Sequence, residues 1–137
     1  MAQALKDVHL DAVVHTVDRE QGFADIAKQH VALAGLSDYV RFNVEDSLTF
    51  LSRIVEEKRH IDFIFIDDNH SFEHVVEEFS IIHPALLLRR GKAYFDNTSE
   101  GGVAEALESI CANYGGNLVR FENCSWRPPG NAIWQPS

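Results

Sequence analysis

The chain has 137 residues, about the length of one domain. Its net charge of −9 argues against a nucleic-acid or anionic-membrane partner, because both attract basic surfaces. The sequence has no long apolar run, no basic leader segment and only two cysteines, so it predicts no membrane span, signal peptide or disulfide framework and favours a cytoplasmic setting. Since no repeat or Pro/Ser-rich linker divides it, we expect a single domain over residues 1–137.

Strands and helices alternate along the first half of the chain. Residues 13–17 are rich in β-branched side chains and predict a strand that ends at Asp18. The helical stripe that follows consists of Phe23, Ile26, Ala27, Val31 and Ala34. Gly35 is expected to close this helix. Residues 40–44 alternate apolar and polar side chains, as a half-buried strand does, and apolar residues at helical spacing over 48–55 predict the next helix.

The second half of the chain repeats the alternation and then changes. Its predicted elements are a strand over 61–66, a helix over 72–86, a strand over 92–95, a helix over 103–114 and two short strands over 118–122 and 132–134. Pro84 lies inside the long helical stripe, so we expect a kink or a break there, and Gly91 is expected to close that helix. The Arg-Pro-Pro-Gly sequence of residues 127–130 is typical of a turn and predicts a hairpin at the end.

This order of elements predicts an α/β fold, with a Rossmann-like, doubly wound sheet that is mostly parallel and ends in an antiparallel hairpin. In such sheets, ligands bind outside the carboxyl ends of the strands. Carboxylate or amide side chains follow each of the first four predicted strands there: Asp18, Asp46, Asp67, Asp68, Asp96 and Asn97. Helix capping is the open alternative for these residues, and Ser47, Ser71 and Ser99 are expected to be caps.

Asp67 and Asp96 form the most informative pair. On adjacent parallel strands their carboxylates would repel each other unless a cation or a shared proton intervenes. Together with the amide oxygen of Asn97 they would offer three oxygens to a hard divalent cation such as Mg²⁺. His70 follows at the entry to a helix, where an imidazole suits proton acceptance from a substrate hydroxyl. Asp18, at a strand end before a helix, is placed to accept hydrogen bonds from a ribose diol.

The other histidines lack such a context and are expected to be surface or packing residues, and neither cysteine shows catalytic or metal-ligand spacing.

Several segments resemble the class I S-adenosylmethionine-dependent methyltransferases: His-Thr-Val-Asp at 15–18, Ala-Gly-Leu at 34–36, Val-Arg-Phe at 40–42 and Ile-Asp-Phe-Ile-Phe-Ile-Asp at 61–67. The sequence Ile-Asp-Asp-Asn-His-Ser-Phe-Glu at 66–73, with Tyr-Phe-Asp-Asn at 94–97, is similar to the metal-dependent O-methyltransferases of the catechol type. The similarity is to the branch with an Asp-x-x-His-Ser-Tyr/Phe-Glu motif, and it covers nearly the whole chain.

The resemblance implies that the protein uses S-adenosylmethionine as cofactor. It implies that Asp18 binds the cofactor ribose and that Asp46 and Ser47 lie at the adenine. Asp68 stands where the branch often has glycine and falls among the cofactor-binding residues.

The resemblance also implies a divalent metal such as Mg²⁺ and methyl transfer to the hydroxyl of a small molecule. Asp67, Asp96 and Asn97 match the metal ligands of the family. His70 falls near the position of the family's base, although catechol-type enzymes use a lysine nearby, and Asp67 shares the catalytic position with it. In the implied mechanism the metal lowers the pKa of the acceptor hydroxyl and His70 assists its deprotonation.

One departure concerns the start of the fold. The family begins with a strand and a glycine-rich loop, whereas about a dozen residues precede the strand ending in Asp18 and Gly22 is the first glycine. Residues 1–10 are expected to be the remnant of a first helix, so the fold is expected to be truncated at its N-terminus. The resulting gap in mid-sheet would be closed by pairing of the flanking strands or covered by a second chain in a homodimer.

Three hypotheses follow: a metal-dependent O-methyltransferase, a methyltransferase-like binding or assembly module without cofactor, or an inactive α/β domain.

Overall fold

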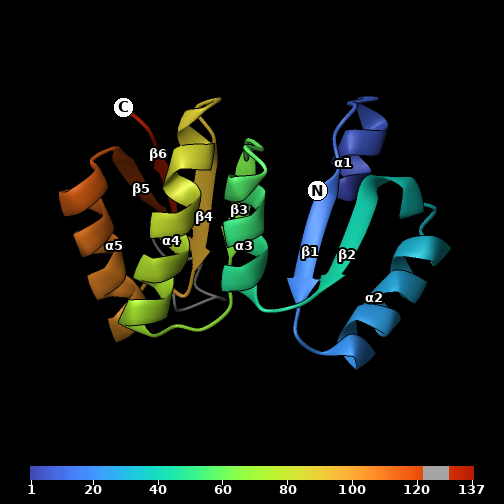
Figure 1. The fold of residues 1–137 in the computed structure, drawn as a ribbon, viewed down its shortest axis with the longest axis horizontal. Coiled ribbons are helices and arrows are strands. Elements are labelled where there is room, and N and C mark those ends of the chain that lie inside the picture. Colours follow the sequence, from blue (N-terminus) through green and yellow to red (C-terminus); the bar gives the residue numbers. More distant parts are fainter. Residues whose placement is uncertain (122–129) are drawn as a thin grey trace. The chain divides into compact units, whose positions relative to one another are not determined.

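The structure is a computed structural model that describes residues 1–121 and 130–137 (Figure 1). The chain divides into two compact units, Met1–Phe50 and Leu51–Ser137. Its elements are α1 (Ala2–Asp7), β1 (Val14–Asp18), α2 (Gln21–Leu33), the 3₁₀ turn η1 (Ser37–Tyr39), β2 (Val40–Val44), α3 (Ser47–Glu56), β3 (Phe63–Ile66), α4 (Phe72–Leu87), β4 (Lys92–Asp96), α5 (Gly101–Tyr114), β5 (Asn117–Phe121) and β6 (Asn131–Gln135). The predicted alternation of strands and helices is therefore confirmed. Cys124 and most of the predicted turn at 127–130 lie outside the described residues.

The first unit contains a parallel pair of strands connected by a helix. β1 pairs with β2 in a register that runs from Val14 opposite Val40 to Asp18 opposite Val44. α2 connects the two strands, and Gly35 follows it with a positive φ of 65°, as predicted for a residue that ends a helix. The predicted apolar face of α2 is not buried as expected: Phe23, Ile26 and Ala34 are exposed, and Ala27 and Val31 are only half-buried. The buried residue of this helix is Ala24, which lies outside the predicted stripe. Helical spacing alone therefore did not distinguish the packed side of α2 from its exposed side.

The second unit contains a mixed sheet with strand order β3-β4-β6-β5. β3 and β4 are parallel, and β6 runs antiparallel to both β4 and β5, so the predicted terminal hairpin is confirmed. α4 and α5 pack side by side on this unit (Figure 1). The core side chains that are fully buried include Phe79, Ile82, Leu86, Phe95, Leu107, Ile110 and Trp134.

Helix α4 is continuous from Phe72 to Leu87, so of the predicted kink or break at Pro84 the break is ruled out. Proline removes one backbone donor and crowds the carbonyl four residues earlier, which belongs to Ser80. Pro84 is exposed, and water can reach this side of the helix. The residue with positive φ after α4 is Arg90, at 56°, and not Gly91. Gly91 is required for a different reason, because a Cβ there would collide with the carbonyl oxygen of Ile61.

No helix in the described part of the chain has both the length and the apolar composition needed to cross a membrane.

Candidate active site

The first part of the site lies at the carboxyl ends of β3 and β4. The last pair in the parallel register joins Ile66 to Phe95. Asp67 directly follows Ile66, and Asp96 directly follows Phe95. Both aspartates therefore lie at the same end of this sheet, as the sequence predicts. Their surroundings differ: Asp67 is exposed, whereas Asp96 is 3% exposed.

Asp96 is held by the neighbouring antiparallel strand. Asn131, which pairs with Asp96 in the β4–β6 register, can turn its amide nitrogen towards three acceptors. In that orientation it donates to Asp96 Oδ1 at 2.5 Å and to the Tyr94 hydroxyl at 2.9 Å. A buried carboxylate needs such donors, because burial without a hydrogen bond carries a large desolvation cost. The terminal hairpin therefore positions Asp96 within the site.

His70 lies between two carboxylates. Its Nδ1 is 3.0 Å from Glu100 Oε2, and its Nε2 is 3.7 Å from Asp67 Oδ1. Nε2 is buried and has no hydrogen-bond partner among the described residues. A hydrogen bond from Nδ1–H to Glu100 would assign the proton of a neutral ring to Nδ1 and leave the lone pair on Nε2. This arrangement is that of an imidazole that is held on one side and can accept a proton on the other.

Glu100 connects His70 to the end of β4. The Asn97 side-chain nitrogen donates to Glu100 Oε1 at 2.8 Å, and the backbone N–H of Glu100 donates to the Asn97 carbonyl at 2.9 Å. Asn97 has a positive φ of 55°, a conformation that asparagine tolerates better than most residues. The amide oxygen of Asn97, which is the predicted metal ligand, lies outside this bond. Glu100 therefore fixes both a predicted ligand and the predicted base.

Sequence reasoning missed Glu100. It is the N-cap residue of α5, and its side chain makes no capping bond to the helix, which frees it for His70 and Asn97. The available signal was its position four residues after Asp96, at the start of a helix. That signal alone does not identify His70 as its partner, because the two residues are 30 positions apart.

Gly102 allows α5 to start against the loop that carries His70. A Cβ at this position would collide with the His70 carbonyl oxygen and would lie 3.0 Å from the Phe72 nitrogen. Glycine therefore lets the first turn of α5 approach this backbone closely. The close approach brings Glu100, two residues earlier, within reach of the imidazole.

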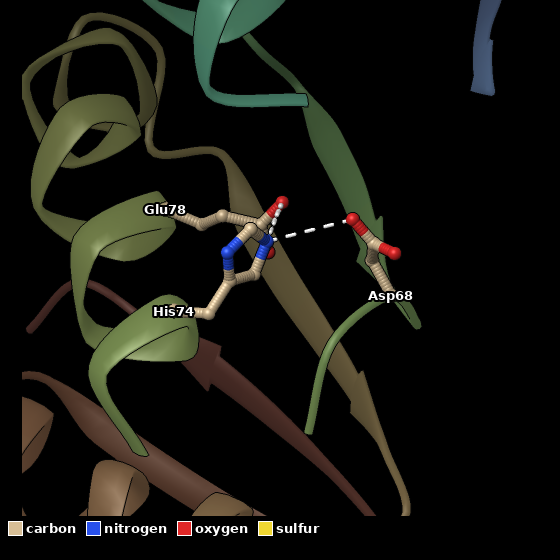
Figure 2. A group of neighbouring side chains, drawn as sticks. All are labelled: Asp68, His74 and Glu78. Atoms are coloured by element: carbon tan, nitrogen blue, oxygen red, sulfur yellow. Dashed lines mark ion pairs between the residues drawn. The ribbon is translucent and has the colours of Figure 1, made fainter. Parts of the chain in front are cut away.

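Asp68 belongs to a second cluster, with His74 and Glu78 (Figure 2). Its Oδ2 is 3.4 Å from His74 Nε2, and the same nitrogen is 3.5 Å from Glu78 Oε1. Sequence reasoning placed Asp68 with the cofactor-binding residues, treated His74 as a surface or packing residue and did not consider Glu78. The four-residue spacing of His74 and Glu78 on one helix was the signal that could have identified the pair.

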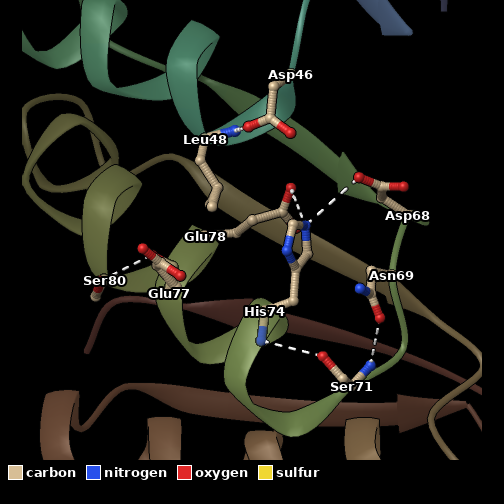
Figure 3. A network of polar contacts seen from close by, with 9 residues as sticks. All are labelled: Asp46, Leu48, Asp68, Asn69, Ser71, His74, Glu77, Glu78 and Ser80. Atoms are coloured by element: carbon tan, nitrogen blue, oxygen red, sulfur yellow. Dashed lines mark hydrogen bonds and ion pairs between the residues drawn. The ribbon is translucent and has the colours of Figure 1, made fainter. Parts of the chain in front are cut away.

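The start of α4 is fixed by local hydrogen bonds (Figure 3). Asn69 Oδ1 accepts from the Ser71 N–H at 3.0 Å, and Ser71 Oγ accepts from the His74 N–H at 3.4 Å. Ser71 is therefore the N-cap, as predicted. The same prediction is wrong for Ser99, since Glu100 is the N-cap of α5, whereas Ser47 is the first residue of α3.

The predicted cofactor acids Asp18 and Asp46 lie in the first unit. Asp18 ends β1, and its Oδ1 accepts from the Glu20 N–H at 2.7 Å. Asp46 Oδ1 accepts from the Leu48 N–H at 3.0 Å, immediately before the first turn of α3, whose first residue is Ser47 (Figure 3). A small hollow of about 40 Å³ lies beside Asp18 and is lined by Thr16, Asp18, Phe23, Ala24, Ala27, Phe42 and Asn43. Each acid thus makes a local turn and retains a second carboxylate oxygen outside the bond described.

Several solved structures with a similar fold are O-methyltransferases by their description. An O-methyltransferase from Bacillus cereus in complex with SAH is 25% identical, with a TM-score of 0.71 over 91% of this chain and 63% of that one. A putative caffeoyl-CoA O-methyltransferase from Staphylococcus aureus is 20% identical, with a TM-score of 0.70 over 91% of this chain and 65% of that one. TomG from Streptomyces achromogenes, an O-methyltransferase involved in tomaymycin synthesis and solved with SAM, is 20% identical, with a TM-score of 0.70 over 93% of this chain and 64% of that one. The chain therefore spans less than two thirds of the length of these proteins.

A family match adds sequence evidence to the likeness of fold. No curated protein matches the sequence. Residues 1–98 match the family described as "Methyltransferase domain", and this segment includes Asp18, Asp67, His70, Asp96 and Asn97. The resemblance expected from the sequence, to class I S-adenosylmethionine-dependent O-methyltransferases, is thereby confirmed: the chain belongs to the methyltransferase domain family.

Proposed function

We propose that the protein transfers a methyl group from S-adenosylmethionine to the hydroxyl of a small molecule, with the help of a divalent cation. In this reaction the bond from sulfur to the methyl carbon breaks, a bond from that carbon to the acceptor oxygen forms, and the hydroxyl loses its proton. The observation that carries the proposal is His70, held through Nδ1 by Glu100 while the buried Nε2 faces Asp67 without a hydrogen-bond partner among the described residues. An imidazole in this state can take the hydroxyl proton.

The donor set at the ends of β3 and β4 fits a hard cation. Asp67 and Asp96 supply carboxylate oxygens, and Asn97 supplies an amide oxygen, which are the ligand types that Mg²⁺ prefers. We infer that these three residues hold the metal. A bound Mg²⁺ would act as a Lewis acid and lower the pKa of the acceptor hydroxyl. The Asn97 amide nitrogen donates to Glu100, which leaves the amide oxygen as the side-chain atom that could bind a cation.

His70 would accept the proton at Nε2. The resulting imidazolium would be stabilised by Glu100 on Nδ1 and by the nearby Asp67 carboxylate. Glu100 acts here as a positioning residue, because it sets the ring orientation and the tautomer without meeting the substrate. The close approach of α5 at Gly102 keeps this pair together.

The first unit would bind the cofactor. We propose that Asp18 accepts hydrogen bonds from the ribose hydroxyls through the oxygen that the Glu20 N–H does not occupy. Asp46 and Ser47 would lie at the adenine, at the start of α3. We propose that Asp68 lies beside the cofactor; its carboxylate also makes an ion pair with His74.

We also propose that both units form one methyltransferase-like domain over residues 1–137, and that a homodimer covers exposed strand surface. The family match runs across the boundary between the units. β3 is an edge strand of the sheet in the second unit, and its Phe63 and Phe65 are 44% and 45% exposed. Exposed apolar edge strands favour pairing with another chain. Light scattering at several protein concentrations measures the mass, and a monomer throughout would contradict the dimer.

Calorimetric titration of the whole chain with S-adenosylmethionine, with and without Mg²⁺, tests the proposed function. We expect binding heat and a rise in melting temperature, and we expect the response to Mg²⁺ to disappear in Asp67→Asn and Asp96→Asn. Asp62→Asn is the matched control, because Asp62 is exposed, lies before β3 and faces His60. An absence of heat and of a thermal shift would contradict the enzyme and favour the alternative, a methyltransferase-like module that binds or assembles without cofactor.

A further inference from the structure

We propose that Asp68, His74 and Glu78 form a second metal site, specific for Zn²⁺ or a similar transition metal, that is separate from the ligands proposed for Mg²⁺. The three side chains come from two places: Asp68 from the loop after β3, and His74 and Glu78 from successive turns of α4 (Figure 2). One ligand atom from each lies within 4.8 Å of the other two. The proposal does not depend on methyl transfer.

The geometry of the cluster fits a metal at its centre. Both carboxylates approach the same nitrogen, Nε2 of His74, at 3.4 Å and 3.5 Å. One N–H can direct its hydrogen well at only one of two acceptors. A tetrahedral Zn²⁺ with ligands at about 2.0–2.1 Å places neighbouring ligand atoms roughly 3.3–3.4 Å apart. The two separations from His74 Nε2 are therefore close to the edge length of such a tetrahedron, and the two carboxylate oxygens lie within 4.8 Å of each other.

The chemistry of the ligands selects the class of metal. An imidazole nitrogen with two carboxylate oxygens suits Zn²⁺, whereas Mg²⁺ prefers oxygen ligands and octahedral geometry. Two carboxylates also offset the charge of a divalent cation. Glu78 is 4% exposed, and a buried carboxylate is stabilised by a cation beside it. Asp68 is exposed, so water can occupy a fourth ligand position.

Hydrogen bonds hold the backbone between Asp68 and His74 in place (Figure 3). Ser71 accepts from the His74 N–H, and Asn69 accepts from the Ser71 N–H, which links the loop to the first turn of α4. The four-residue spacing places Glu78 one turn after His74 on the same side of the helix. A metal here would tie Asp68 to α4 and thereby fix the loop that carries Asp67 and His70.

Titration of the chelator-treated whole chain with Zn²⁺ tests the site, with Co²⁺ as a spectroscopic probe of tetrahedral geometry. We expect one tight site and strong visible absorption from Co²⁺. Removal of a residue that only hydrogen-bonds to a metal ligand usually weakens metal binding at least about tenfold. Removal of a ligand itself is therefore expected to weaken Zn²⁺ binding by at least that factor. The ligand variants are Glu78→Gln and Asp68→Asn. Because Asp68 is exposed, Asp68→Asn is expected to fold normally even if replacement of the buried Glu78 disturbs folding.

Two control variants distinguish binding at this cluster from a general effect of charge and from binding at the proposed Mg²⁺ ligands. Glu77→Gln makes the same charge change at an exposed residue next to Glu78. The described hydrogen bond of Glu77 is accepted by its backbone carbonyl from Ser80, so this variant should leave Zn²⁺ binding unchanged. Asp96→Asn removes a proposed Mg²⁺ ligand and should also leave Zn²⁺ binding unchanged. The proposal is overturned if the wild-type chain does not bind Zn²⁺, or if folded Asp68→Asn and Glu78→Gln bind it as tightly as Glu77→Gln does.

Discussion

The two units of the molecule differ in how well they bury their apolar side chains. In the second unit Phe79, Phe95 and Trp134 are fully buried. In residues 1–50, all of which the structure describes, the buried hydrophobic residues are Ala24, Val40 and Phe50, while Phe23 and Leu33 are 64% and 86% exposed. Regions with few buried apolar contacts open locally at lower free energy. The groups proposed for chemistry thus lie in the better-packed unit, and the acids proposed for cofactor binding lie in the other.

The largest expected effect concerns the core of the second unit. Trp134 is fully buried, donates from Nε1 to the Gly115 carbonyl at 2.8 Å and packs edge-on against Phe79. Trp134→Ala is expected to lower the free energy of unfolding by about 3–5 kcal/mol, because it leaves a cavity and removes the hydrogen bond to Gly115. Phe23→Ala in the first unit is the comparison and should change it by about 0.5 kcal/mol or less. Urea unfolding measures both, and equal losses would contradict the difference between the units.

Because proton transfer is proposed for the second unit and cofactor binding for the first, variants in the two units should have different kinetic defects. His70→Gln should lower kcat about 100-fold or more and leave the Kd for S-adenosylmethionine unchanged, because it removes a proton acceptor only. Asp18→Asn should raise that Kd. Glu100→Gln should lower kcat less than His70→Gln does, and Glu105→Gln, exposed on the same helix, is its control. Equal effects of Glu100→Gln and Glu105→Gln would exclude a positioning role for Glu100.

Two neighbouring glycines test the close approach of α5. Gly102→Ala is expected to destabilise the protein by about 1–3 kcal/mol, because the added Cβ collides with the His70 carbonyl oxygen. Gly101→Ala meets nothing within 4 Å and should be neutral or stabilising by up to about 1 kcal/mol. Thermal unfolding of the pair gives the comparison. Similar melting temperatures for the two variants would show that α5 does not depend on this contact.

The smallest expected effect is a pH dependence in the second unit. Burial lowers the pKa of His83, which lies among the rings of Phe79, Tyr114 and Trp134. The unfolded chain therefore binds this proton more readily than the folded chain, and the free energy of unfolding falls as the pH drops through about 6.5. His83→Phe keeps a ring there and should reduce the loss between pH 7.5 and pH 5.5. An identical loss in both proteins would contradict the assignment.

The strands and the acids at their ends could be predicted from the sequence because both follow from local pattern. Period-two alternation located β2, and a continuous apolar run located β3, so Asp67 and Asp96 fell at the strand ends. Glu100 and Glu78 could not be found this way. Their partners His70 and His74 are set by the packing of α5 and by the path of the loop before α4, which no local pattern records.

The failures of sequence reasoning have a similar cause. An apolar stripe predicts a helix but does not reveal how much of the stripe is covered, as Phe23 and Ile26 demonstrate. Proline is disfavoured inside a helix by local sterics, yet the buried residues on either side of Pro84, Ile82 and Ala85, keep α4 in the core. Tertiary packing decided both outcomes.

Methyl transfer itself is the most direct measurement of the proposed chemistry. The whole chain, supplied with S-adenosylmethionine labelled in its methyl group, would be incubated with catechol as a probe acceptor, with and without Mg²⁺. We expect label to enter the acceptor only with Mg²⁺, and we expect His70→Gln to lower the rate about 100-fold or more. Transfer that needs no divalent cation and is unchanged in His70→Gln would contradict the proposed function, as would a chain that binds S-adenosylmethionine and Mg²⁺ yet transfers no label to any hydroxyl acceptor.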